Sequence, residues 1–251
     1  MVYYLIVSLP FIVFFTRLGL TNVLIPFNKK KSLYKQMQKR IDWPRIQSIE
    51  QTLQTLFKGS HGKIISFIYR KIRGVSDKEF IYGEIDFLSF HNILEQTQPK
   101  LGEVFYDLGS GTGKAVFSAG LFYSLSKSCG IELLPPLYEK AANQLKKLVN
   151  FTQALPLDSE YSLSEKISSI QFINDSFLNY DFYDANIIYV AATCLNHATW
   201  ENLITKMTAL KTGTRIIVAT KSIEYEEFDL IYQGTELMSW GLCPIKIYKK
   251  C

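Results

Sequence analysis

An α/β fold built on a mostly parallel sheet is predicted by three features of the sequence. Short apolar segments alternate with helical segments from about residue 104 onward. A glycine-rich turn follows the first of these apolar segments directly. The 251 residues are 47% hydrophobic and 20% charged, a globular composition with room for one domain and an N-terminal extension.

Helices are expected ahead of the sheet. Apolar residues recur at helical spacing in a first segment: Ile46, Ile49, Leu53, Leu56 and Phe57. Gly59 and Gly62 end that helix, and a second begins near Lys63. A further helix runs from about Asp86 to Gln96, before Pro99. The first two helices suggest a lid or adapter, and simple packing against the sheet is the alternative.

The sheet is expected to contain five strands and a terminal hairpin. The strands are Val104–Leu108, Cys129–Glu132, Ile170–Asn174, Asn186–Val190 and Arg215–Ala219. Helices between them start near Gly113, Leu137 and Thr199, and Thr152–Lys166 is a polar connection. The segment Phe228–Tyr248 has two extended runs around Ser239-Trp240-Gly241, which predicts an antiparallel hairpin that closes the sheet.

The turn after the first strand has the pattern D-x-G-x-G-x-G. It reads Asp107-Leu108-Gly109-Ser110-Gly111-Thr112-Gly113. Glycines let the backbone approach a ligand closely, beside a helix N-terminus that attracts negative charge. A nicotinamide-binding turn normally reads G-x-G-x-x-G, so the spacing disfavours an NAD-dependent oxidoreductase. The acidic residue before the first glycine favours S-adenosylmethionine, with Asp107 contacting its amino-acid part directly or through water.

Two later strand ends complete the predicted cofactor site. Glu132 ends the second strand with a carboxylate that can accept both ribose hydroxyls. After the third strand, Asp175 suits the adenine amino group, the Ser176 N–H a ring nitrogen and Phe177 a stacking contact. The alternative for Asp107, Glu132 and Asp175 is a role as capping or surface carboxylates.

Residues 1–28 form an apolar N-terminal segment, and residues 1–27 predict membrane association through a transmembrane helix. Val2–Phe15 carries no charge, and Arg17 separates it from the apolar run Leu18–Phe27. The uninterrupted run is shorter than the roughly 20 residues of a full span, so a helix packed on the soluble domain stays open. A signal peptide is disfavoured because no basic region precedes the run. Lys29–Lys31 would place the rest of an anchored chain on the cytoplasmic side; without an anchor the protein is expected in the cytoplasm.

Charge and cysteine usage narrow the function further. The net charge of +5 is mild, and it makes only a weak case for nucleic-acid contact through the basic segment 29–45. The four cysteines form no C-x-x-C pair, which argues against structural zinc and a secreted disulfide protein. The three histidines are not spaced like metal ligands, so no metal is predicted.

Taken together, these motifs resemble the class I, non-SET histone-lysine methyltransferases named for disruption of telomeric silencing, nearest to their short bacterial and algal relatives. The match covers roughly Phe80 to Lys249. Its marks are Tyr82-Gly83-Glu84, the glycine turn, Gly130-Ile131-Glu132, Thr193-Cys194 and Met238-Ser239-Trp240-Gly241. The resemblance implies a seven-stranded, Rossmann-like methyltransferase domain over residues 80–251, preceded by a basic linker and helical adapter over 29–79.

The resemblance also implies site roles and a substrate. Tyr82, Gly83 and Glu84 would close over the methionine end of the cofactor, and Tyr82 and Thr193 are the candidate catalytic residues. The implied activity is methyl transfer from S-adenosylmethionine to a protein lysine, possibly in a histone. Relatives usually carry an asparagine after the fourth strand, whereas this chain has Ala191 and Ala192. An inactive cofactor-binding module, or an N-methyltransferase of a non-histone or small-molecule substrate, therefore stays open.

Overall fold

The computed structural model describes residues 28–73, 83–153, 161–239 and 241–251. The chain divides into two units, with the boundary between Trp43 and Pro44. In the first unit, residues 28–37 are helical. The ring of Tyr34 packs edge-on against that of Trp43, with centroids 4.9 Å apart.

The predicted transmembrane helix is contradicted. Among the residues that the structure describes, no helix combines the length and the apolar character that crossing a bilayer requires. The segment on which the prediction rested, residues 1–27, lies outside the described residues.

The second unit contains the predicted α/β sheet, with seven strands in the order β3-β2-β1-β4-β5-β7-β6. The strands are β1 (Val104–Leu108), β2 (Lys127–Glu132), β3 (Ile170–Asn174), β4 (Ile187–Ala191), β5 (Arg215–Ala219), β6 (Phe228–Met238) and β7 (Gly241–Lys250). Only β7 runs antiparallel to its neighbours, β5 and β6. The seven-stranded Rossmann-like sheet is therefore confirmed. Its strand order reverses between β1 and β4, and ligands of such sheets bind at the carboxyl ends of the strands around this point.

The helices start close to their predicted positions, with one exception. They are α2 (Trp43–Leu56), α3 (Gly62–Arg73), α4 (Phe87–Gln96), α5 (Lys114–Phe122), α6 (Pro135–Gln153), α7 (Tyr161–Ser168), the 3-10 turn η3 (Ala192–Cys194) and α8 (His197–Met207). Helix α7 begins inside the stretch Thr152–Lys166 that the sequence predicted as a polar connection and ends just beyond it, so that prediction is wrong. Tertiary contacts explain the error: Ile167 is buried, and Lys166 Nζ donates to the Leu121 carbonyl at 2.9 Å.

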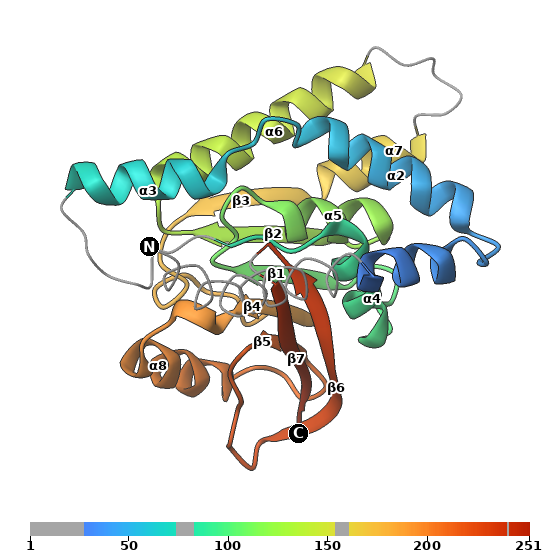
Figure 1. Ribbon diagram of the computed structural model, residues 1–251. Helices are drawn as coiled ribbons and strands as arrows, with labels where there is room; N and C mark the ends of the chain where they lie inside the picture. The colour runs from blue at the N-terminus through green and yellow to red at the C-terminus, as the bar shows by residue number, and fades with distance from the viewer. Residues whose placement is uncertain (1–27, 74–82, 154–160, 240) are drawn as a thin grey trace, which may run out of the picture. The chain divides into compact units, whose positions relative to one another are not determined.

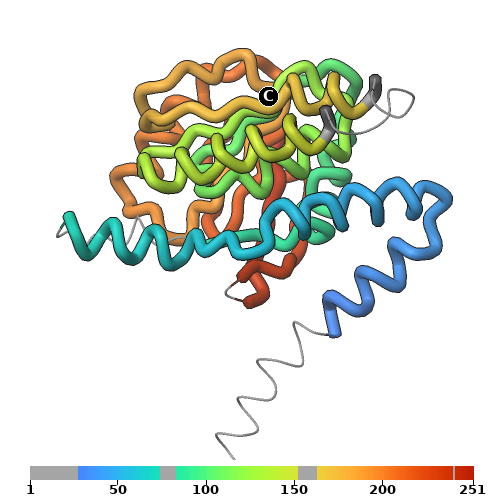
Figure 2. The backbone as a smooth tube through the Cα atoms, turned by 90° about the horizontal axis from the view of Figure 1, so that it is seen from above, coloured from blue at the N-terminus to red at the C-terminus, as the bar shows by residue number. Residues whose placement is uncertain are grey.

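Helices cover both faces of the sheet. Successive side chains of a strand point to opposite faces, so the apolar strands present apolar side chains on both faces for helices to cover. On one face, Phe90 of α4 packs against Phe105 and Tyr189, with ring centroids 5.9 and 5.1 Å apart. On the other, Tyr106 and Leu108 belong to a buried apolar cluster that includes residues of α8. Figure 1 shows α8 on the opposite side of the sheet from α5 and α6. Helix α3 runs alongside α6 (Figure 2).

Candidate active site

A cavity of about 600 Å³ lies at the carboxyl ends of β1, β2 and β4. Its volume is in the range of small-molecule sites. Six of the residues predicted from the sequence line it: Gly83, Gly109, Glu132, Ser176, Phe177 and Thr193. The other described candidates are not among the lining residues, and Tyr82 lies outside the described residues.

The glycine turn forms one wall of the cavity. Gly109 has φ +88° and Gly113 has φ +89°, a region that side chains other than glycine rarely adopt. The N–H of Gly109 donates to the Ile131 carbonyl at 2.9 Å, which fastens the turn to β2. A Cβ atom at Gly113 would lie 2.5 Å from the Phe172 ring, whereas one at Gly109 would meet no atom within 4 Å. Gly113 is thus needed for packing, and Gly109 leaves open space for a ligand.

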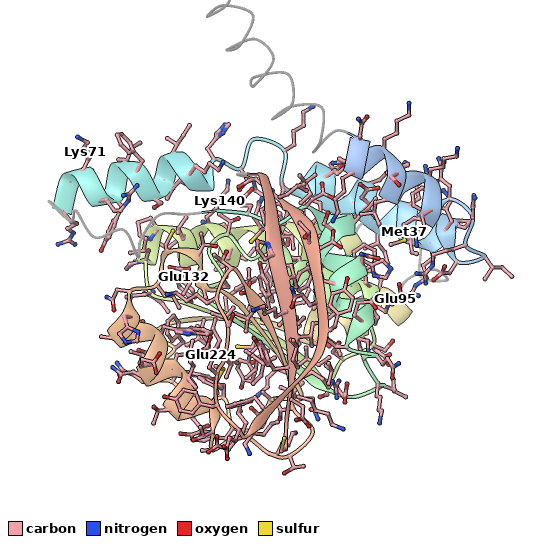
Figure 3. The ribbon with its side chains drawn as sticks, turned by 60° about the horizontal axis from the view of Figure 1, so that its bottom comes forward. Met37, Lys71, Glu95, Glu132, Lys140 and Glu224 are labelled. Atoms are coloured by element: carbon pink, nitrogen blue, oxygen red, sulfur yellow. The ribbon has the colours of Figure 1, made fainter. Side chains whose placement is uncertain are left out.

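Glu132 is the acidic residue among those that line the cavity. It is 7% exposed and ends β2 among the side chains of the interior (Figure 3). Its Oε2 accepts the N–H of Gly111, and its Oε1 accepts the N–H of Leu134, each at 2.7 Å. Burial raises the pKa of Glu132, although these backbone N–H groups act to lower it. Each oxygen keeps a lone pair, so the carboxylate can still accept two hydroxyl groups from a ligand.

Asp107 belongs to β1, directly before the turn, and is not among the residues that line the cavity. It is 3% exposed at the carboxyl side of β1. Burial, together with the charge of Glu132, raises the pKa of Asp107 well above its usual value. If both buried carboxylates, Asp107 and Glu132, are ionised at neutral pH, their repulsion destabilises the folded state.

Asp107→Asn is therefore expected to stabilise the ligand-free protein. In the unfolded chain Asp107 titrates near 3.8, while the folded state holds the proton to higher pH. Wild-type stability must then fall as the pH rises between these two pKa values, and asparagine removes that loss. At about pH 8 we expect the melting temperature of Asp107→Asn to exceed that of the wild type by about 2–4 °C for each kcal/mol gained in the free energy of unfolding. Near pH 4 we expect a smaller difference between the two melting temperatures. Melting curves at both pH values test this. Equal melting temperatures of the variant and the wild type at both pH values would contradict the claim that ionised Asp107 destabilises the folded protein.

The loop after β3 forms the wall on the predicted adenine side. Ser176 and Phe177 line the cavity, but Asp175 does not. The Asp175 carboxylate instead accepts the N–H of Ser176 at 2.7 Å. Asp175 therefore shapes the turn, and it accepts the N–H of Ser176 that was predicted to donate to an adenine ring nitrogen.

Lys206, on α8, holds this loop in place. Its Nζ donates to three carbonyl oxygens, those of Phe177 at 3.1 Å, Leu178 at 2.9 Å and Tyr180 at 2.6 Å. It also lies 4.9 Å from the centroid of the Phe182 ring. Sequence reasoning missed Lys206, because a lysine in an amphipathic helix carries no local signal for a contact with a distant loop.

The predicted lid segment is described from Gly83 onward. Gly83 lines the cavity, while the Glu84 carboxylate pairs with Lys114 and accepts the Thr112 hydroxyl at 3.3 Å. The Glu84 carbonyl accepts the N–H of Ser239 at 2.7 Å, and the Glu84 N–H donates to the Ser239 hydroxyl at 3.0 Å. Glu84 thus joins the lid segment to both the glycine turn and the hairpin. The role of Ser239, from the motif Met238-Ser239-Trp240-Gly241, is to make the contacts on the hairpin side.

The remaining wall follows β4. Ala191, Thr193 and Cys194 line the cavity there, and Lys63 of α3 also belongs to its lining. Alanine at position 191 brings no hydrogen-bonding side chain to this wall. The Thr193 hydroxyl is the candidate polar group, and it lies 2.7 Å from the Thr220 hydroxyl. Sequence reasoning missed Lys63, which lines the cavity, and Thr220, which contacts Thr193. Neither residue belongs to a motif that the sequence analysis identified.

A family model described as "Histone methylation protein DOT1" matches residues 73–238. A protein of Eremothecium gossypii named "Histone-lysine N-methyltransferase, H3 lysine-79 specific" is 32% identical over 145 residues, which are 57% of this chain and 24% of that protein. A protein of the same name from Debaryomyces hansenii is 26% identical over 202 residues, 78% of this chain and 16% of that protein. The chain thus spans less than a quarter of the length of these relatives.

Among solved structures, an RNA methyltransferase from Salinibacter ruber in complex with S-adenosyl-L-homocysteine resembles this chain with a TM-score of 0.48 and 18% identity. The match covers 64% of this chain and 89% of that one.

Proposed function

The chain belongs to the DOT1 histone methylation family, and from this premise we propose that it is an S-adenosylmethionine-dependent protein-lysine N-methyltransferase of the histone-lysine type. The observation that carries the proposal is the position of Glu132. Its buried carboxylate ends β2 and faces a cavity beside the glycine turn. This is where a ribose would lie in a Rossmann-like sheet.

The residues around the cavity fit an adenosine-bearing cofactor. Glu132 would accept the two ribose hydroxyls, and the open space at Gly109 would admit the part of the cofactor next to the glycine turn. Apolar side chains that suit an adenine ring line the same cavity: Leu133, Leu134, Leu137, Phe177 and Leu178. Together with Gly83 at the lid segment, these residues would hold S-adenosylmethionine.

The chain's own contribution to catalysis would be positioning and exclusion of water. Bound S-adenosylmethionine supplies a methyl group that its sulfonium charge already activates. A free lysine has a pKa near 10.4, so the amine must lose a proton before it can react. An apolar cavity disfavours the charged ammonium form, which lowers that pKa without a dedicated base. Thr193 provides a hydroxyl in the wall where the acceptor would enter, and Tyr82 stays a proposed catalytic residue.

Lys206→Met is expected to weaken cofactor binding by roughly 5–30-fold, corresponding to one or two kcal/mol. Methionine keeps the length of the side chain but cannot donate to the carbonyls of the loop after β3. Calorimetry with S-adenosylhomocysteine measures the effect. Lys211→Met is the matched control, because Lys211 donates to the Asp184 carbonyl at 2.9 Å, away from the cavity. Equal losses in both variants would show that Lys206 has no specific role in the site.

A cofactor-binding module without catalytic activity is the second candidate. The observation that favours it is Ala191, which lines the cavity where relatives usually carry an asparagine. Such a module would bind S-adenosylhomocysteine tightly and would transfer no methyl group to any fraction of a cell extract.

Labelled-methyl transfer separates these functions. Purified protein is incubated with S-adenosylmethionine carrying a labelled methyl group and with separated protein, nucleic-acid, lipid and small-molecule fractions. We expect label in protein that is recovered as methyllysine after hydrolysis. Label confined to the other fractions would refute the lysine substrate and leave methyl transfer in place. A parallel titration with NAD is expected to show no binding.

A further inference from the structure

Thr220, the residue after β5, has a strained backbone. Its φ is +77°, and Gln98 is the one other non-glycine residue with positive φ in the part of the chain that the structure describes. A β-branched residue is especially unfavourable in this region. The N–H of Lys221 donates to the Ala219 carbonyl at 3.0 Å, which makes a γ-turn centred on Thr220, a rare and strained conformation. Such strain persists where the surrounding structure enforces it, and it concentrates at functional sites.

Three contacts hold Thr220 in this conformation. Its N–H donates to the Pro244 carbonyl at 2.9 Å. Its Oγ1 lies 3.1 Å from Cys243 Sγ and 2.7 Å from Thr193 Oγ1. Cys243 is buried, whereas Thr193 lines the cavity. The strained turn therefore joins a buried thiol to the wall of the active site.

In each of the two Thr220 hydroxyl contacts, either atom can be the donor. Cys243 Sγ lies 3.5 Å from the Pro244 carbonyl and can donate its single proton there. The Thr220 hydroxyl can then donate to Cys243 Sγ, and the Thr193 hydroxyl can donate to Thr220. With this order of donors, Thr193 Oγ1 keeps lone pairs that can accept a hydrogen bond from a group in the cavity.

We propose that Thr220 is a positioning residue that fixes Thr193 Oγ1 as a hydrogen-bond acceptor for the substrate's amine. This inference rests on the proposed function and deepens it. A neutral amine can direct its lone pair at the methyl group and still donate an N–H to Thr193. A carboxylate or a thiolate has no hydrogen to donate, so this wall selects a nitrogen acceptor. The hydroxyl pair supplies the polar contact that Ala191 does not.

Paired binding measurements test the proposal without turnover. The probes are S-adenosylhomocysteine and sinefungin, an analogue in which an amine-bearing carbon replaces the methylated sulfur. Thr220→Gly accepts the positive φ and removes the hydroxyl, and Thr220→Ser restores the hydroxyl. We expect Thr220→Gly to lose about tenfold in sinefungin affinity, with S-adenosylhomocysteine affinity changed by less than about twofold. Thr220→Ser is expected to recover the sinefungin affinity.

Two further variants complete the design. Thr193→Val removes the acceptor without changing the strained turn, and it is expected to show the same selective loss. Thr208→Val is the control, because the Thr208 hydroxyl donates to the Thr205 carbonyl within the α8 region. The inference is overturned if Thr220→Gly and Thr193→Val lose no more affinity for sinefungin than for S-adenosylhomocysteine. That result would leave the proposed function standing. If neither compound binds the wild-type protein, the proposed function fails, and this inference fails with it.

Discussion

Glu132→Ala is expected to weaken the binding of S-adenosylmethionine by about 10–150-fold. Hydrogen bonds to a charged acceptor contribute about 1.5–3 kcal/mol, and each 1.4 kcal/mol is a factor of ten in affinity. Both oxygens of Glu132 also hold backbone N–H groups, those of Gly111 and Leu134. The alanine variant therefore loses the ribose contacts and loosens the turn that shapes the cavity.

A second variant separates these two effects. Glu132→Gln keeps one oxygen as an acceptor and removes the negative charge, so we expect a loss of affinity between those of wild type and Glu132→Ala. Glu224→Ala is the control, since Glu224 is exposed. Calorimetry gives the affinities, and melting curves verify that each variant folds. Unchanged affinity in a folded Glu132→Ala protein would remove Glu132 from the cofactor site.

Gly113→Ala is expected to destabilise the protein by about 2–5 kcal/mol. A left-handed backbone costs an alanine roughly 1–2 kcal/mol, and overpacking adds about 1–3 kcal/mol. The overpacking arises because the new Cβ would lie 2.5 Å from the Phe172 ring and 3.2 Å from the Phe117 ring. Denaturant unfolding measures the loss.

Gly109→Ala is the matched comparison for this prediction. Gly109 and Gly113 have almost the same φ, +88° and +89°, but a Cβ at Gly109 would meet no atom within 4 Å. Gly109→Ala should therefore lose only the roughly 1–2 kcal/mol of backbone strain. Its methyl group would point into open space at the cavity, so its main effect should be on cofactor affinity. Equal destabilisation of the two variants would contradict the packing role of Gly113.

The sheet could be predicted from sequence because its signals are local. The strands Val104–Leu108, Ile170–Asn174 and Arg215–Ala219 have the predicted bounds. Each is a short run rich in apolar residues that ends at a turn, a pattern typical of a strand. Val104–Leu108 and Arg215–Ala219 are mostly buried, whereas Ile170–Asn174 is mostly not. The glycine turn was equally visible, because its spacing and its place between a strand and a helix are both local properties.

What sequence reasoning missed depends on contacts between distant residues. Helix α7 was hidden by the polarity of its segment. Lys206 reaches the loop after β3 from another helix. Thr220 owes its conformation to bonds with Pro244 and Thr193, and nothing in the local sequence marks a strained threonine.

The sequence could predict which residues lie near the cavity, but not which partner each side chain contacts. Motif spacing singled out Glu132, Gly109 and Ser176, and all three line the cavity. It could not tell that Glu84 pairs with Lys114, or that Asp175 bonds to its own neighbour. A carboxylate at a strand end can face a ligand or the protein, and side-chain packing decides between them. The cofactor-binding roles of all the predicted site residues stay predictions.

The most direct test of the central claim is mass spectrometry of histones and nucleosomes after incubation with the purified protein and S-adenosylmethionine. The proposed function predicts a histone lysine that gains the mass of one or more methyl groups over time, with little gain when the Glu132→Ala protein is used instead. A wild-type protein that binds S-adenosylmethionine yet leaves every lysine of these substrates unmodified would contradict the claim of histone-lysine methylation.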